Sequence, residues 1–151
     1  MKTLVITSMY ANPIHPGHIE CIEKCSELGG ELWVIVNNDQ QQLLKTGKIF
    51  QDEDFRLKVV ESIKCVDRAY LSIDKDSTVC KTIENIFNTW KYWFDDFIFA
   101  KGGDRNAGNI PEKETCDRLG IKIVDGLGDK IHSSSEYRNK VVRFPAYEET
   151  A

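Results

Sequence analysis

Short apolar runs alternate with amphipathic stretches along the whole chain. Runs rich in β-branched and aromatic residues predict buried strands, because strands covered on both faces are apolar at nearly every position. Five such runs are present: 3–7, 31–37, 68–73, 121–126 and the run from 96 that leads directly into Gly102 and Gly103.

Between these runs, apolar residues recur at helical spacing. In the first such stretch, "HPGHIECIEKCSEL", Ile19, Ile22, Cys25 and Leu28 share one face, and Gly29-Gly30 is typical of a helix end. The same spacing predicts further helices over 52–63, 77–93, 111–120 and 133–142. The polar stretch 38–50 shows no such period and is predicted to be a long loop.

Strands that alternate with helices predict a parallel sheet built from βαβ units. The 151 residues contain no repeat and no composition change that would mark a linker. We therefore expect one α/β Rossmann-like domain over 1–151, with a five-stranded parallel sheet and helices on both faces.

Composition narrows the classes of function. Hydrophobic residues make up 41% of the chain, charged residues 29%, and the net charge is −4, which disfavours a nucleic-acid partner. No apolar run is long enough to span a bilayer, so no membrane partner is expected. The five cysteines (21, 25, 65, 80 and 116) include no CxxC pair, which is typical of reduced thiols in a cytoplasmic protein.

Three unusual loops fall where the predicted strands end: 8–18, 101–109 and 125–135. In an open parallel sheet, ligands bind beyond the carboxyl ends of the strands. The polar and glycine-rich residues of these loops are therefore expected to form one ligand site.

The first loop holds His15 and His18, two of the three histidines of the chain, around Pro16-Gly17. A helix that begins here would direct free N–H groups and its dipole at an anion, and two imidazoles beside it suit a polyphosphate. Two alternatives remain open from the residues alone. The histidines could be ordinary surface residues, or they could bind zinc together with Cys21 and Cys25.

The segment "NPIHPGH" resembles the HxGH signature of the nucleotidyltransferases that adenylylate or cytidylylate phosphorylated small molecules. In that family the loop follows the first strand, as it does here, and its histidines hold the nucleotide phosphates. One position departs from the family, which usually has phenylalanine where this chain has Ala11.

Two further motifs resemble the same family. "HSSSEYR" (132–138) is similar to its ISSTxxR signature, in which hydroxyls at a helix start and an arginine bind phosphates. "AKGGDR" (100–105) is similar to the KGGD of heptose-1-phosphate adenylyltransferases and, more loosely, to the loop of glycerol-3-phosphate cytidylyltransferases. An ordinary serine cap and an ordinary glycine turn are the alternatives for these two segments.

The resemblance implies transfer of a nucleoside monophosphate from an NTP, with Mg²⁺, to a phosphate on a small molecule, releasing pyrophosphate. ATP is favoured over CTP, and the favoured acceptor is a sugar or polyol phosphate. We expect a homodimer. The alternatives are a CTP-dependent cytidylyltransferase of the glycerol-3-phosphate or amino-alcohol phosphate type, a nucleotide-binding module without catalysis, and the zinc-stabilised domain.

The resemblance also implies roles for individual residues. Those implied to be catalytic are His15, His18, Lys45 and Arg138. Those implied to bind the nucleotide are Thr7, Ser8, Met9, Tyr10, Asn12, Gly17, Gly102, Gly103, Asp104, Ser133, Ser134 and Ser135. Lys45, Lys48 and Arg56 match the family less closely, and an ordinary position on the solvated surface is the alternative for each lysine. No role is assigned to Lys48 and Arg56.

Overall fold

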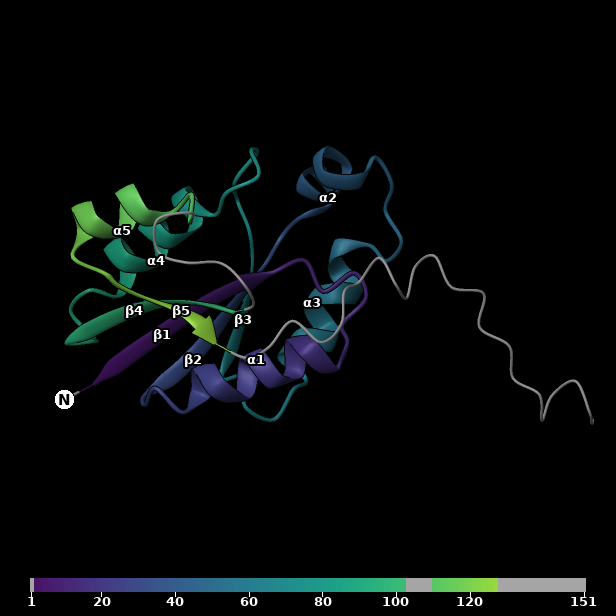
Figure 1. Cartoon of the computed structure of the whole chain (residues 1–151). Helices are drawn as coiled ribbons and strands as arrows, with labels where there is room; N and C mark the ends of the chain where they lie inside the picture. Colours follow the sequence, from purple (N-terminus) through teal and green to yellow (C-terminus); the bar gives the residue numbers. More distant parts are fainter. Residues whose placement is uncertain (1, 103–109, 128–151) are drawn as a thin grey trace, which may run out of the picture.

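A five-stranded parallel sheet forms the centre of the protein (Figure 1). The computed structural model describes residues 2–102 and 110–127. The strands lie in the order β3-β2-β1-β4-β5. Their bounds are β1 Thr3–Met9, β2 Glu31–Val36, β3 Arg68–Leu71, β4 Asp96–Gly102 and β5 Lys122–Leu127. The order reverses direction beside β1, because β2 lies on one side of it and β4 on the other. The predicted α/β Rossmann-like fold is confirmed.

Helices cover both faces of this sheet, as predicted (Figure 1). The described helices are α1 Pro16–Ser26, α2 Asp39–Thr46, α3 Glu53–Glu61, α4 Cys80–Trp90 and α5 Lys113–Leu119. Helices α1 and α3 pack on one face and α4 and α5 on the other. Within the described ranges, no helix has the length and apolar character needed to cross a membrane.

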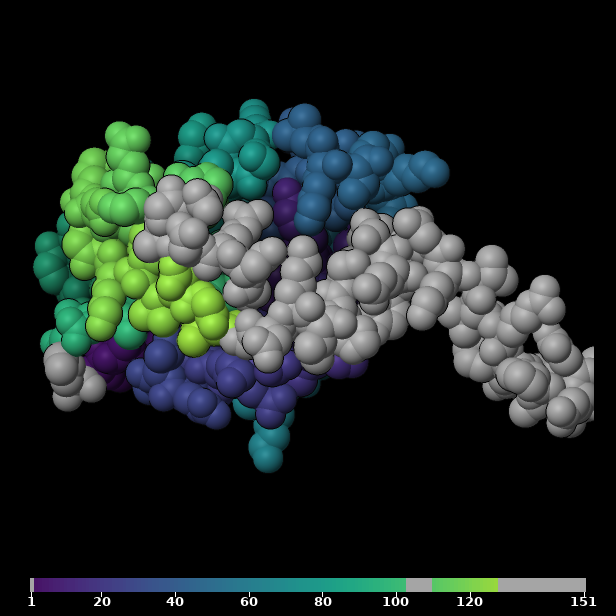
Figure 2. All heavy atoms as spheres, in the orientation of Figure 1, coloured from purple at the N-terminus to yellow at the C-terminus, as the bar shows by residue number. Residues whose placement is uncertain are grey.

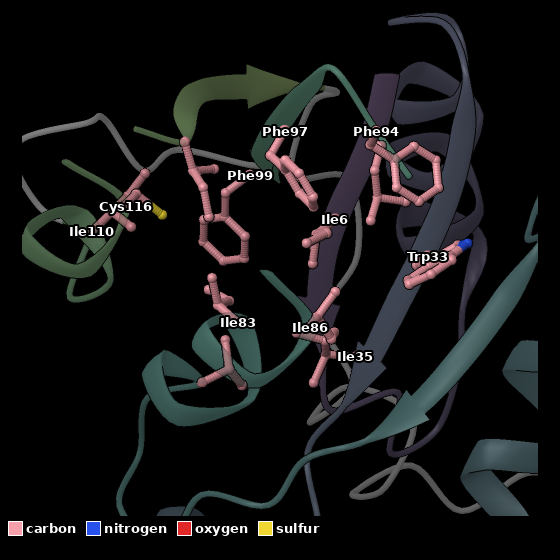
Figure 3. Packing of buried hydrophobic residues seen from close by; sticks show 13 residues of the cluster. Ile6, Trp33, Ile35, Ile83, Ile86, Phe94, Phe97, Phe99, Ile110 and Cys116 are labelled. Carbon is pink, nitrogen blue, oxygen red and sulfur yellow. The ribbon is translucent and has the colours of Figure 1, made fainter. Parts of the chain in front are cut away.

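The two faces of β1 and β2 carry different cores, because successive strand residues point to opposite sides. Leu4, Ile6 and Ile35 pack against α4 and α5, in a cluster that also contains Phe97 and Phe99 (Figure 3). At one end of that cluster the ring of Trp33 meets Trp90 and Phe94 edge-on, with centroids 5.4 and 5.6 Å apart. Val5, Val34 and Val36 pack instead against α1 and α3. Burial on both faces explains the continuous apolar runs in the sequence.

The predicted loop 38–50 is wrong in its first part, because α2 forms there. The helix begins at a capping box, in which Asn38 Oδ1 accepts the N–H of Gln41 at 2.9 Å and Gln41 Oε1 accepts that of Asn38 at 3.0 Å. It ends at Gly47 in the left-handed conformation (φ 74°). Its buried face is polar, since Gln41 Nε2 donates to the backbone carbonyls of Asp76 and Thr78 at 2.7 Å. An apolar period therefore could not reveal this helix.

The other boundaries differ only at their ends. The helix predicted over 77–93 is α4, Cys80–Trp90, and the face formed by Val79, Ile83, Ile86 and Trp90 packs in the core. The strand predicted over 68–73 ends at Leu71. The predicted helix 133–142 lies outside the described residues.

Candidate active site

The two histidines lie at the start of α1 and bind its backbone. His15 is the N-cap residue, and its Nδ1 accepts the N–H of Gly17 at 3.0 Å. His18 Nδ1 accepts the N–H of His15 at 3.2 Å, and the two rings stack with centroids 3.8 Å apart. Because each Nδ1 is an acceptor, each neutral ring carries its proton on Nε2. The pair therefore has two Nε2–H donors beside the positive end of a helix dipole.

His18 is a neutral donor in this structure. Burial, the neighbouring His15 and the charge of Lys45 lower the pKa of His18 from 6.5 to about 3. A neutral imidazole can donate a hydrogen bond to a phosphate oxygen, but it brings no charge of its own. The positive charge that a polyphosphate needs must therefore come from other residues.

Lys45 is one source of that charge, and α2 places it beside the histidine loop. Its Nζ lies 4.1 Å from the centre of the Tyr10 ring, and its charge acts on His18. The structure therefore brings Lys45, Tyr10 and His18 together, as the sequence predicted for a shared site. Lys48, beyond the C-cap of α2, is exposed, and its carbonyl accepts the hydroxyl of Thr46 at 2.9 Å.

Lys101 is a second source of positive charge at this end of the sheet, and the sequence analysis assigned it no role. Its Nζ donates to Ser8 Oγ at 2.7 Å, which links the carboxyl ends of β4 and β1. Lys101 also helps to lower the pKa of Cys21, after the larger effect of the hydrogen bond with Cys25. The signal for Lys101 was its place directly before the double glycine, at the end of a strand beside β1.

Three further residues of the predicted site, on β1 and in the loop after it, are buried and make structural contacts. Thr7 and Met9 are buried, and the carbonyl of Met9 accepts the N–H of Asn37 at 3.0 Å. Asn12 is also buried, and its Oδ1 accepts the N–H of Gln51 at 2.9 Å. These residues shape the edge of the sheet where the histidines lie.

Arg56 is fully buried and acts on the backbone of this site. Its guanidinium donates to the carbonyls of Gln51 (2.8 Å), Tyr10 (2.8 Å) and Asn37 (2.6 Å), and to Asp39 Oδ1 at 3.0 Å. One side chain thus joins the loop after β1, the end of β2, the start of α2 and the loop before α3. Through these bonds Arg56 holds the loop that leads to the histidines, and the start of α2, in fixed positions.

Gly102 is required by close packing. A Cβ atom at this position would lie 2.6 Å from both Cys21 Sγ and the carbonyl oxygen of Leu127. The close approach seen here is to α1 and β5, and the predicted role of Gly102 in nucleotide binding stays a prediction. Ala11, where the family usually has phenylalanine, is buried at a left-handed φ of 51°.

The zinc alternative is not supported. No group of three or more His, Cys, Asp or Glu side chains that could hold a metal ion occurs in the described ranges, which include His15, His18, Cys21 and Cys25. Both Nδ1 atoms are engaged by backbone N–H groups, and all five cysteines are free thiols, as predicted.

The second half of the predicted site lies outside the described residues. It comprises Gly103, Asp104, Ser133, Ser134, Ser135 and Arg138, together with the start of the HSSSEYR segment at His132. Their expected roles stay predictions.

Within the described part, then, two imidazole donors lie at a helix N-terminus, Lys45 lies close enough to act on His18, and Lys101 binds Ser8 at the end of β1. Lys45 comes from the β2 side of β1, and Lys101 comes from the β4 side. Such an arrangement binds anionic phosphates and can stabilise charge that develops on them.

Several known proteins resemble this chain in sequence or in fold. An FAD synthase from Methanocorpusculum labreanum is 43% identical over 95% of this chain and 97% of its own length. An FAD synthase from Archaeoglobus profundus is 41% identical over 82% of this chain and 88% of its own length.

The solved structures that resemble this chain include a lipopolysaccharide core biosynthesis protein from Thermoplasma volcanium. It is 25% identical, with a TM-score of 0.64 over 85% of this chain and 98% of that one. A bifunctional NMN adenylyltransferase/ADP ribose pyrophosphatase from Francisella tularensis shares the fold alone, at 11% identity and a TM-score of 0.64, over 95% of this chain and 43% of that one. The sequence model of the cytidylyltransferase-like family matches residues 10–125. With paired histidines at the start of α1 and this match over most of its length, the chain belongs to the cytidylyltransferase-like family and is a nucleotidyltransferase.

Proposed function

We propose that this nucleotidyltransferase is an FAD synthase, which transfers AMP from ATP to FMN and releases pyrophosphate. The observation that carries this proposal is the 43% identity, over 95% of the chain, to a relative named FAD synthase. The relatives do not support a free sugar phosphate as the acceptor. FMN carries its phosphate on a ribityl chain that is attached to an aromatic isoalloxazine ring.

The reaction is a displacement at the α-phosphorus of ATP. An oxygen of the FMN phosphate forms a bond to that phosphorus, and the bond to the β-phosphate oxygen breaks, so that pyrophosphate leaves. Attacking and leaving oxygens lie roughly in line, and catalysis depends on positioning and on the neutralisation of charge.

The histidine pair supports this chemistry through its Nε2–H donors. In the proposed mechanism His18 and His15 donate to the oxygens of the transferring phosphate, where negative charge increases in the transition state. Because both Nδ1 atoms bind backbone N–H groups, the rings are oriented before substrate arrives. Preorganised donors of this kind need no rearrangement during the reaction.

The lysines supply charge on either side of the pair. Lys45 is assigned to the phosphate of FMN and Lys101 to the phosphates of ATP, because they approach from opposite sides of β1. The predicted roles of Ser133, Ser134, Ser135 and Arg138 at the β- and γ-phosphates, and of Gly103 and Asp104 in the base pocket, complete the proposal.

Mg²⁺ is proposed to enter with the nucleotide. The described residues offer no cluster of three or more carboxylate, imidazole or thiol groups for an ion. Mg²⁺ prefers oxygen ligands and keeps several waters, and it is commonly bound through substrate phosphates, where it neutralises their charge. Lys45, Lys101 and the histidine donors would orient the phosphates around it.

The test is direct chromatographic detection of FAD after incubation of the purified protein with FMN, ATP and Mg²⁺. We expect FAD and pyrophosphate in equal amounts. Parallel reactions replace ATP with CTP, and FMN with glycerol 3-phosphate or a heptose phosphate. Turnover with CTP, or with a sugar phosphate in preference to FMN, would overturn the FAD synthase assignment and leave the nucleotidyltransferase class intact.

A further inference from the structure

The exposed apolar side chains of this protein are concentrated in one segment. Eight large hydrophobic residues are exposed within the described ranges, and five of them fall between residues 43 and 55. These five are Leu43, Leu44, Ile49, Phe50 and Phe55, and we call them the α2–α3 apolar surface. They lie on α2, on the segment that joins it to α3, and on α3 itself. Single exposed apolar residues are normal, whereas several within one short segment point to a binding surface.

This surface adjoins the histidine loop. Phe50 directly precedes Gln51, whose N–H donates to Asn12 Oδ1 at 2.9 Å, and Leu44 directly precedes Lys45, which lies over Tyr10. Arg56 fixes the same region by donating to the carbonyls of Gln51 and Tyr10 at 2.8 Å. In Figure 1, α2 stands beyond the end of the sheet toward which β1 runs, and Figure 2 shows its segment (blue) at the surface.

The topology also decides which substrate lies on this side. Lys101 and Gly102, which the proposed function assigns to the nucleotide, end β4, whereas α2 follows β2 on the opposite side of β1. Attacking and leaving groups must lie on opposite sides of the α-phosphorus. An NTP that occupies the β4 side therefore leaves the β2 side, with Lys45 and the α2–α3 apolar surface, to the acceptor.

We propose that the α2–α3 apolar surface binds the isoalloxazine ring of FMN while Lys45 binds its phosphate; this inference rests on the proposed function. The acceptor has one flat aromatic end and one dianionic end. The segment offers the same pairing, with two exposed phenylalanine rings and three aliphatic side chains beside a lysine that acts on His18. Aromatic side chains stack well on flat ring systems. The residues that select a flavin from other phosphates are therefore Leu44, Phe50 and Phe55.

The experiment removes the ring from the ligand and, separately, the apolar side chains from the protein. Affinities for FMN and for ribitol 5-phosphate, which lacks the ring, are measured by calorimetry with Mg²⁺ and a non-hydrolysable ATP analogue. The variants are Phe50→Ser and Leu44→Ser. Tyr92→Ser is the matched control, because Tyr92 is 89% exposed and lies between α4 and the amino end of β4, whereas α2 follows the carboxyl end of β2. We expect Phe50→Ser to raise the Kd for FMN about tenfold and to leave that for ribitol 5-phosphate unchanged. Tyr92→Ser should change neither.

The outcomes separate this inference from the proposed function. If the wild type forms FAD but both variants bind FMN within twofold of the wild type, the ring does not bind here and the inference is overturned. If the wild type forms no FAD from FMN and ATP, the proposed function is wrong. Sedimentation of the same variants tests the other occupant: variants that change oligomeric state and keep their FMN affinity would make the surface a contact between copies of the chain, which also overturns the inference.

Discussion

His15 and His18 hold each other in place through the backbone of α1. The Nδ1 of His18 accepts the N–H of His15 at 3.2 Å, and the rings stack 3.8 Å apart. The pair thus serves as a helix cap and is also the proposed phosphate site. A substitution at either position therefore changes stability as well as chemistry, and the two effects have to be separated by the choice of variant.

His18→Asn and His18→Ala separate them. Asparagine keeps an acceptor close to the position of Nδ1 but has no group at the position of Nε2. We expect both variants to lose about two to three orders of magnitude in turnover, the typical cost of one preorganised donor. His18→Ala should in addition lose about 1 kcal/mol of unfolding free energy, because the cap acceptor is removed.

FAD formation and urea denaturation measure these two quantities. His18→Gln is the complementary variant, since its amide N–H₂ lies close to the position of Nε2 and can still donate. It should retain more turnover than His18→Asn. Equal turnover in the asparagine variant and the wild type would remove Nε2 from the mechanism.

The lowered pKa of His18 predicts how stability depends on pH. Between pH 6.5 and about 3 the unfolded chain protonates this imidazole and the native protein does not. The unfolded state then binds more protons, so the free energy of unfolding falls as the pH is lowered through this window, by at most about 1.4 kcal/mol per pH unit from this group. Above pH 6.5 the contribution of His18 is constant.

The difference between the wild type and His18→Asn isolates this contribution, because other titrating groups are shared. Denaturation curves at intervals from pH 4 to 8 should show the wild type losing stability relative to the variant below pH 6.5. Parallel curves over the whole range would show that His18 titrates normally in the native protein.

Arg56→Lys tests whether the buried guanidinium joins the elements of the site. A lysine ammonium cannot reach three carbonyls and a carboxylate in the fixed fork geometry of arginine. Buried carbonyls left without a donor cost about 1–3 kcal/mol each, so we expect a loss of at least about 3 kcal/mol in unfolding free energy. The loss is read from denaturant midpoints. Lys58→Arg, on the exposed side of α3, is the control and should change stability by less than about 0.5 kcal/mol.

The residues that sequence analysis located best are those whose patterns are local. Val79, Ile83 and Ile86 show a helical period because their face is apolar, and the His15–His18 spacing fixes a capping pair within one helix turn. The alternation of strands and helices along the chain is also visible locally, and it predicted the parallel sheet.

The features that it missed depend on contacts between distant segments. Helix α2 buries Gln41 against the carbonyls of Asp76 and Thr78, which no period in 38–50 can indicate. The sequence assigned no role to Arg56, because its role depends on the carbonyls of Tyr10, Asn37 and Gln51, which only the fold brings around it. Lys101 becomes part of the site only because β4 pairs with β1 and places it beside Ser8.

Gly102→Ala tests the close packing between β4, α1 and β5. The added methyl group would meet Cys21 Sγ and the Leu127 carbonyl, both at 2.6 Å, and overpacking of this kind typically costs about 1–3 kcal/mol. Cys21→Ala removes the sulfur but not the carbonyl. The double variant should therefore recover part of the lost stability, with a coupling energy of at least about 0.5 kcal/mol between the two positions.

Gly120→Ala is the matched control for this cycle. Its φ of 76° makes alanine unfavourable, but a Cβ there meets no atom within 4 Å, so it should cost about 1 kcal/mol and show no coupling to Cys21→Ala. Thermal denaturation of the six proteins (wild type, three single and two double variants) gives both coupling energies. If Gly102→Ala and Cys21→Ala simply add, the glycine is not required by its contact with α1. If they couple as expected, the size of the side chain at position 21 sets how closely β4 can lie against α1, the helix that His15 caps and that contains His18.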